Sequence, residues 1–341
     1  MTLFNDVFSQ DAFGFASLTA AVNELPYTES RLGEMALFGT PEGLETDTAI
    51  IDMTEGQIGI LSTRQRGAPP ERALKDKKNT SRVVMVPHLQ FEDRVSAASL
   101  IGKRKPGMQN EVESVADKLN DRFTKMINMQ LEPTREIHRL GALRGQLLDA
   151  DGSVIEDYFD LFDVVQQTHN YVFTAATTDI RAVTQQAIRK IRNSLGGVPF
   201  TGVRAICGAN FYDALISHAK VRDTYLNHEA ASQLRENMIN TPFAFGGVIW
   251  EEYRGMDNLG AANLGTVDPD ECIMFPEGVP GMYRTYVSPA GFLETVNTIG
   301  IDMYAKVAPD WKYGEHVDQL IESNPLYINT RPRAVLKVTA S

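Results

Sequence analysis

The clearest pattern of apolar and polar positions lies in residues 108–131. Apolar side chains recur there at steps of three and four residues: Val112, Val115, Ala116, Leu119, Phe123, Met126, Ile127 and Leu131. This period is typical of an amphipathic helix, and at about 1.5 Å per residue it predicts a rod roughly 35 Å long. Pro133 is expected to break or kink the rod, because proline lacks an N–H group and crowds the preceding turn. Residues 134–144 are expected to continue as helix.

A second amphipathic helix is predicted between residues 180 and 195. Thr177 or Thr178 can cap its start. Gly196 and Gly197 can end it, because glycine tolerates the left-handed backbone of a helix end. A further helix is expected from Asn210 to about residue 226, after a buried strand.

Short apolar runs bounded by turn residues predict strands. They are residues 49–53, 57–61, 82–86, 203–208, 247–250, 272–275, 282–287, 326–328 and 334–338. Asp151-Gly152 between two apolar runs predicts a hairpin turn and resembles only part of a calcium loop. The mixed order of helices and strands, without a regular βαβ repeat, predicts an α+β fold.

Residues 1–47 are interpreted as an N-terminal arm. Its aromatic side chains, among them Phe4, Phe8 and Phe13, follow no clear period. Such a segment buries its rings either against a neighbouring molecule or, as a terminal strand, against its own domain, and the sequence leaves both open. A short helix is possible near residues 17–23, with Pro26 ending it.

Residues 48–94 are predicted to form an extended hairpin with a long basic loop. The loop, residues 63–80, carries six basic side chains: Arg64, Arg66, Arg72, Lys75, Lys77 and Lys78. Two acidic residues, Glu71 and Asp76, reduce its charge to +4, so the rest of this −11 chain carries −15. A basic projection on an acidic body favours contact between copies of the chain. A solvated loop without a partner remains the alternative.

Composition narrows the class of protein. The chain has 341 residues, of which 43% are hydrophobic, enough for a substantial core in about two domains. No run of about 18 apolar residues predicts a membrane span, and the N-terminus does not resemble a secretion signal. Two cysteines cannot build a disulfide framework, which favours a reducing cytoplasm. The acidic balance argues against a general nucleic-acid binder.

Motifs that carry chemistry are missing from the sequence. We find no phosphate-binding loop, dinucleotide fingerprint or serine-hydrolase elbow, and the six histidines are dispersed. Cys207 lies in an apolar strand and is expected to be a buried structural thiol. The sequence therefore predicts no catalytic residue, no cofactor and no metal ligand. It leaves the arm, the hairpin and the long helix to be explained by assembly.

Segments along the whole chain resemble the lambda-like major capsid protein E family of tailed phages. The segments that carry the resemblance are residues 25–27, 31–38, 68–70, 86–93, 139–145, 148–153, 205–209, 245–247, 323–328 and 331–332. The most specific of them is Arg139-Leu-Gly-Ala-Leu-Arg-Gly145. Order and spacing, more than any single segment, make the match specific.

The resemblance implies the HK97-like capsid fold, with an N-terminal arm, an extended hairpin loop, a peripheral domain and an axial domain. The arm would be 1–47 and the hairpin 48–94. The peripheral domain would take 95–185, including the spine helix, plus 296–341, and the axial domain 186–295. No lysine–asparagine crosslink between subunits is expected.

The function implied is that of a major capsid protein without catalysis. Copies would self-assemble as pentamers and hexamers into an icosahedral head around double-stranded DNA. A scaffold protein would guide assembly in the host cytoplasm, and a decoration protein is a possible further partner of the virion. The arm and the hairpin, with the aromatic and basic residues named above, would contact neighbouring subunits.

Three alternatives stay open at this point. An encapsulin-like compartment would share the fold but enclose protein cargo. A cytoplasmic enzyme would use the basic loop as a lid over an anionic substrate. A tail or neck component of a phage would form rings or tubes.

Overall fold

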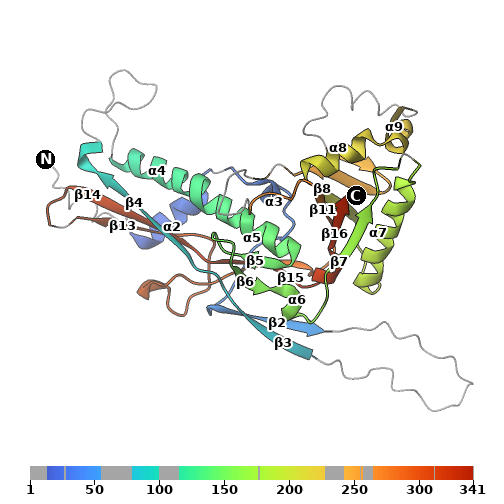
Figure 1. The fold of residues 1–341 in the computed structure, drawn as a ribbon. Coiled ribbons are helices and arrows are strands. Elements are labelled where there is room, and N and C mark those ends of the chain that lie inside the picture. Colours follow the sequence, from blue (N-terminus) through green and yellow to red (C-terminus); the bar gives the residue numbers. More distant parts are fainter. Residues whose placement is uncertain are drawn as a thin grey trace, which may run out of the picture. The chain divides into compact units, whose positions relative to one another are not determined.

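The computed structural model describes residues 14–26, 28–54, 79–99, 115–175, 177–226, 242–253, 255, 264–310 and 312–340 (Figure 1). The described residues divide into two compact units. Unit 1 takes those within 1–49, 85–140 and 284–328, and unit 2 those within 50–84, 141–283 and 329–341. The expected strand at 57–61 lies outside the described residues. Within these ranges, no helix is both long and apolar enough to cross a bilayer.

Unit 1 is built on an antiparallel sheet covered by helices. The sheet has the order β13 (Tyr304–Pro309), β14 (His316–Ser323) and β4 (Leu89–Ser96). Helix α2 (Phe15–Glu24) packs on β13, and α4 (Val115–Met126) packs on β14 and β4. Their apolar faces meet in one core: Leu18, Val22, Phe123, Met126, Ile127, Leu131, Met303, Ala305 and Ile321. The short helix expected at 17–23 is therefore real.

Smaller elements complete unit 1. A second sheet has the order β1 (Glu42–Gly43), β12 (Tyr283–Val287) and β15 (Pro325–Asn329), of which Tyr283 and Asn329 are assigned to unit 2. The short helices are α3 (Arg31–Glu34), η2 (Ala97–Ser99) and η4 (Leu293–Thr295).

The long helix continues past Pro133. After α4, a π-helical turn, η3 (Ile127–Leu131), leads directly into α5 (Glu132–Arg144). The Glu132 N–H donates to the Ile127 carbonyl five residues back instead of four. The wider turn leaves room for the proline ring, which would otherwise crowd the preceding turn. It also shifts the hydrogen-bond register of the helix at the position where proline has no N–H to donate. Of the break or kink expected at Pro133, the break is wrong, and the expected continuation as helix to residue 144 is confirmed.

Unit 2 contains a mixed six-stranded sheet. Its order is β7 (Gln167–Tyr171), β16 (Leu336–Ala340), β11 (Glu271–Glu277), β8 (Gly202–Cys207), β10 (Val248–Glu252) and β9 (Phe243–Phe245). The β16–β7 and β10–β8 pairs are parallel and the others antiparallel. Tyr171, Phe211, Trp250 and Phe275 are fully buried in this unit. Antiparallel pairs predominate in both units and the elements follow no regular βαβ order, in agreement with the α+β class.

Helices border this sheet in Figure 1. They are α7 (Ile180–Leu195), α8 (Ala209–Ser217) and α9 (Ala219–Leu226). The short η5 (Pro332–Ala334) packs on α7. Asp179, not Thr177 or Thr178, caps α7, because its carboxylate accepts the Ala182 N–H. Gly196 ends the helix at φ +61° as expected. The single helix expected from Asn210 is wrong, since extended backbone at His218 divides it into α8 and α9.

Two hairpins depart from the sheets. β5 (Gln146–Leu148) and β6 (Val154–Asp157) flank the expected turn, where Gly152 takes φ +87°, and α6 (Tyr158–Leu161) follows. β2 (Thr48–Thr54) and β3 (Asn79–Met85) form a two-stranded ribbon. The basic loop, residues 63–80, lies outside the described residues except for Asn79 and Thr80, which begin β3.

Candidate assembly surfaces

The β2–β3 ribbon has apolar side chains on both of its faces. Ala49, Ile51 and Val84 are buried. The alternate positions stay exposed: Ile50 to 64%, Val83 to 62% and Met85 to 71%. Single exposed apolar residues are ordinary, but an isolated two-stranded ribbon is marginally stable in water. This outer face is therefore a candidate for contact with another molecule.

A second apolar surface is the loop of residues 291–301 between β12 and β13. Leu293 is 92% exposed, Val296 61% and Ile299 63%. The loop is nevertheless firmly held within unit 1. The Thr295 hydroxyl donates to the Ala290 carbonyl at 2.6 Å, and the Gly300 N–H donates to the Leu44 carbonyl at 2.7 Å. We call residues 291–301 the apolar loop.

Close backbone packing fixes the end of the apolar loop. A Cβ atom on Gly300 would lie 2.2 Å from the Val287 carbonyl oxygen, so only glycine fits. Our reading of the sequence missed this surface. The only local signal is the three-residue spacing of Leu293, Val296 and Ile299, which is also typical of a short helix.

A buried polar cluster attaches residues 28–34 to α5. Glu132 and Glu136 are only 1% and 2% exposed. Glu132 Oε1 accepts the Ser30 N–H at 3.2 Å, and Glu136 Oε1 accepts the Leu32 N–H at 3.0 Å. The Ser30 hydroxyl bridges the two carboxylates. Because the bonds join positions about 100 residues apart, they fix where the chain leaves α2.

Arg139 supplies the positive charge of this cluster. Its Nη1 donates to Glu132 Oε1 at 2.5 Å and to the Ser30 hydroxyl at 2.9 Å, and lies 3.7 Å from Glu136 Oε2. Burial alone would lower the pKa of Arg139, but the adjoining Tyr327 and the two carboxylates raise it above its ordinary value. One turn earlier, the buried Arg135 donates to Asp302 at 2.8 Å. The Arg139 guanidinium therefore stays charged, and both arginines link distant segments of unit 1.

Part of the predicted N-terminal arm, residues 1–47, packs on its own unit. From residue 15 onward, the chain packs on its own unit through α2 and the Ser30 cluster. Phe4, Phe8 and Phe13 lie outside the described residues, as do the six basic residues of the hairpin loop. Their contacts with neighbouring subunits stay predictions.

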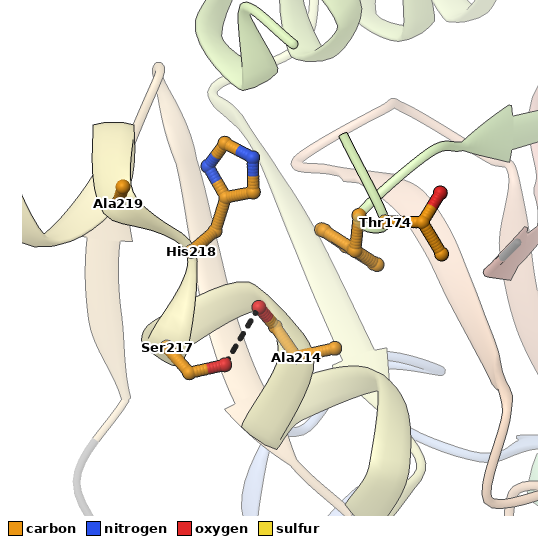
Figure 2. Close-up of a pocket in the computed structure, with 6 residues that line it drawn as sticks. Thr174, Ala214, Ser217, His218 and Ala219 are labelled. Carbon is orange, nitrogen blue, oxygen red and sulfur yellow. Dashed lines mark hydrogen bonds between the residues drawn. The ribbon is translucent and has the colours of Figure 1, made fainter. Parts of the chain in front are cut away.

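Unit 2 has a hollow with a volume of about 420 Å³. Figure 2 shows the residues that line it. They are Phe173, Thr174, Ala214, Ser217, His218 and Ala219. The Ser217 hydroxyl donates to the Ala214 carbonyl at 3.2 Å. His218 Nδ1 accepts the Lys220 N–H, which leaves Nε2 to donate to the Ala175 carbonyl at 3.3 Å. Both side chains are bound to backbone groups, and the lining residues offer no carboxylate for acid–base chemistry.

The cysteines are buried structural thiols, as expected for Cys207. Cys207 on β8 lies directly opposite Cys272 on β11, with the sulfur atoms 3.2 Å apart. Both are fully buried and free. Burial, and then the neighbouring Cys207, raise the pKa of Cys272 well above its ordinary value. No metal-binding group of acidic, histidine or cysteine side chains occurs in the described ranges.

Comparison with solved structures shows the fold. The chain is similar to the putative capsid protein of an E. coli CFT073 prophage (13% identity, TM-score 0.58, 96% of this chain and 99% of that one). It is also similar to the capsid of Cyanophage P-SCSP1u (9% identity, TM-score 0.55, 93% of this chain and 90% of that one). The fold is thus the HK97-like α+β fold of phage capsids, as the resemblance implied.

Sequence comparison gives the family. The model of the phage major capsid protein E family matches residues 14–340, and the chain belongs to that family. The major capsid protein of Pseudomonas phage KPP10 is 25% identical, over 97% of this chain and 98% of that protein. That of Salmonella phage Felix O1 is 23% identical, over 96% of each.

The protein is therefore a major capsid protein of a tailed phage, a structural subunit that self-associates into the shell of the virion. It is not an enzyme. The family supports the predicted capsid function over the encapsulin-like compartment and over the enzyme with a basic lid.

Proposed function

We propose that the outer face of the β2–β3 ribbon and the apolar loop are the surfaces through which copies of this chain contact one another. The observation that carries the proposal is the exposure of Ile50, Val83 and Met85 on strands whose other face is already buried. Burying the rest of each side chain is worth about 1–2 kcal/mol. Such contacts are individually weak, but a closed shell repeats them in every subunit.

The predicted arm and basic loop extend the same proposal. Phe4, Phe8 and Phe13 would bury their rings on a neighbouring subunit. The loop of +4 charge would lie on a neighbour whose remaining chain carries −15. Charge would set the orientation of this contact more than its affinity. The division into arm, hairpin, peripheral and axial domains belongs to the same proposal.

We further propose the partners and the place of assembly. Pentamers and hexamers of this chain would form in the host cytoplasm around a scaffold protein, and a decoration protein would bind outside. The head would enclose double-stranded DNA without sequence-specific contact. The acidic net charge of −11 supports this, because a strongly basic lining would hold the DNA fast.

The test is expression of the chain with its neighbouring phage genes, followed by electron microscopy of purified particles. The expected result is closed shells containing double-stranded DNA. Ile50→Thr/Val83→Thr keeps the β-branched shape but makes the ribbon polar, and it should lower the yield of shells strongly. The matched control is Met129→Gln, which removes an equally exposed apolar side chain (73%) from the helix. Shells at full yield from the ribbon variant would refute this assignment of the interface.

A further inference from the structure

Helix α7 presents an exposed basic face. Its 16 residues contain four basic side chains, Arg181, Arg189, Lys190 and Arg192, and no acidic one. Ile180, Ile191 and the other buried side chains of α7 face the core of unit 2, whereas all four basic residues are exposed. At about 100° per residue, the three arginines lie within about 80° of one another, and Lys190 lies on the other flank. Lys190 donates to the Thr168 carbonyl. Among the described residues, the three arginines have no ion-pair partner for their side chains.

The segment from Gln146 to Gln166 presents the opposite charge. It contains six acidic residues and no basic one: Asp149, Asp151, Glu156, Asp157, Asp160 and Asp163. Asp157 is occupied, since it caps α6 and accepts from Gln146. The other five form no ion pair within the described part of the chain. Burial, and then the neighbouring Asp157 carboxylate, raise the pKa of Glu156.

We propose that the basic face of α7 in one subunit docks on this acidic segment of a second copy. The inference rests on the proposed function, and it assigns a specific contact to the self-association. Both surfaces belong to unit 2, yet no ion pair joins them within one copy. A contact between two different patches is heterologous, so each subunit offers its basic face to one neighbour and its acidic segment to the next. Contacts of this kind close into rings when the rotation between neighbouring subunits closes.

A second copy fits the observations better than nucleic acid does. Phosphate groups would pair with the arginines but would leave the five acidic side chains without a counter-charge. Both surfaces are accounted for when the partner is the same chain. Exposed ion pairs are weak singly, so the contact would set the register between subunits more than their affinity. Repetition around each ring would make it effective.

The test is a charge swap in the full chain. Arg181→Glu/Arg189→Glu reverses two charges of the basic face without removing the cation in the last turn of α7, where it favours the helix dipole. Glu156→Lys/Asp160→Lys reverses two charges of the acidic segment. Each variant should lower the yield of shells about tenfold at low salt, and the chain with all four substitutions should recover most of it.

Controls separate the possible failures. Arg222→Glu/Lys312→Glu changes the net charge as the basic-face variant does but at other exposed positions, and should assemble normally. Circular dichroism of each soluble variant checks folding, and Asp160→Asn/Asp163→Asn repeats the acidic test with a milder change. Unchanged assembly of Arg181→Glu/Arg189→Glu, or a loss that the fourfold variant does not recover, would overturn the proposal. So would full shells that merely lose DNA, the result expected of a nucleic-acid contact. A wild-type chain that forms no shells would refute the proposed function instead.

Discussion

Removal of the Arg139 guanidinium would test how residues 28–34, which follow α2, are held to the long helix. Arg139→Met keeps the length and apolar stem of the side chain but removes its charge. Glu132 and Glu136, 1% and 2% exposed, would then lose the cation that they share in this cluster. Breaking a buried ion pair in this way costs about 3–5 kcal/mol. We expect the loss of stability to lie in the upper part of that range, because two carboxylates lose the same cation.

Hydrogen exchange can follow this loss locally. The Ser30 and Leu32 N–H groups donate to the two carboxylates, so their exchange reports on this cluster directly. A loss of about 4 kcal/mol would speed exchange at these amides roughly a thousandfold when residues 28–34 open on their own. Arg139→Lys should show a smaller effect, because it keeps the charge but not the fork of donors.

A double substitution sharpens the interpretation. Glu136→Gln neutralises one carboxylate, so Arg139→Met should cost less in that background. The same loss in both backgrounds would mean that Arg139 acts through packing, for example on the Tyr327 ring 5.2 Å away. Wild-type exchange rates at Ser30 and Leu32 in the Arg139→Met variant would refute the electrostatic reasoning altogether.

Three further predictions concern close packing and ionisation. Gly141→Ala should lower the midpoint of urea unfolding, because the alanine Cβ would lie 2.6 Å from the Gln146 carbonyl oxygen. A cost of about 1–3 kcal/mol is expected, although alanine by itself favours helices. A raised midpoint would contradict this reasoning. Gly300→Ala should distort the apolar loop and reduce shell yield while the circular dichroism spectrum stays unchanged, and normal shells would argue against that surface. Because burial raises the pKa of Cys272, the folded state resists ionisation of this thiol. The free energy of unfolding should therefore stay constant below the ordinary thiol pKa and fall as the pH rises above it. The fall should be smaller in Cys207→Ala/Cys272→Ala, and an equal pH dependence in both proteins would exclude the thiols as the cause.

The buried charges of α5 mark one limit of sequence analysis. Glu132, Arg135, Glu136 and His138 are all at most 2% exposed, although a sequence pattern places such residues on a solvated face. Besides the nearby Arg139, the partners of Glu132, Arg135 and Glu136 include Ser30 and Asp302, which lie more than 100 residues away in sequence. Nothing in the local pattern marks a charge whose partner lies about 100 residues away.

The N-cap of α7 and the exposed surfaces could likewise not be predicted from the local sequence. The period of α7 predicts its length, but either threonine before it could serve as the cap, and only the backbone path selects Asp179. The apolar loop and the unpaired charges of α7 become visible once burial is known for each side chain. Exposure is a property of the folded chain, so the composition of a segment does not reveal it.

The sequence by itself determined the helices and strands whose apolar period is local, the turn at Gly152, the absence of motifs for chemistry and the capsid family. These depend on neighbouring residues or on segments in a recognisable order. Tertiary structure alone decided that β16 pairs with β7 and β11, that the helix passes Pro133 through a π turn, and which apolar and charged side chains stay exposed. The physical reason is that pairing and burial depend on contacts between residues distant in the chain, which no local period encodes.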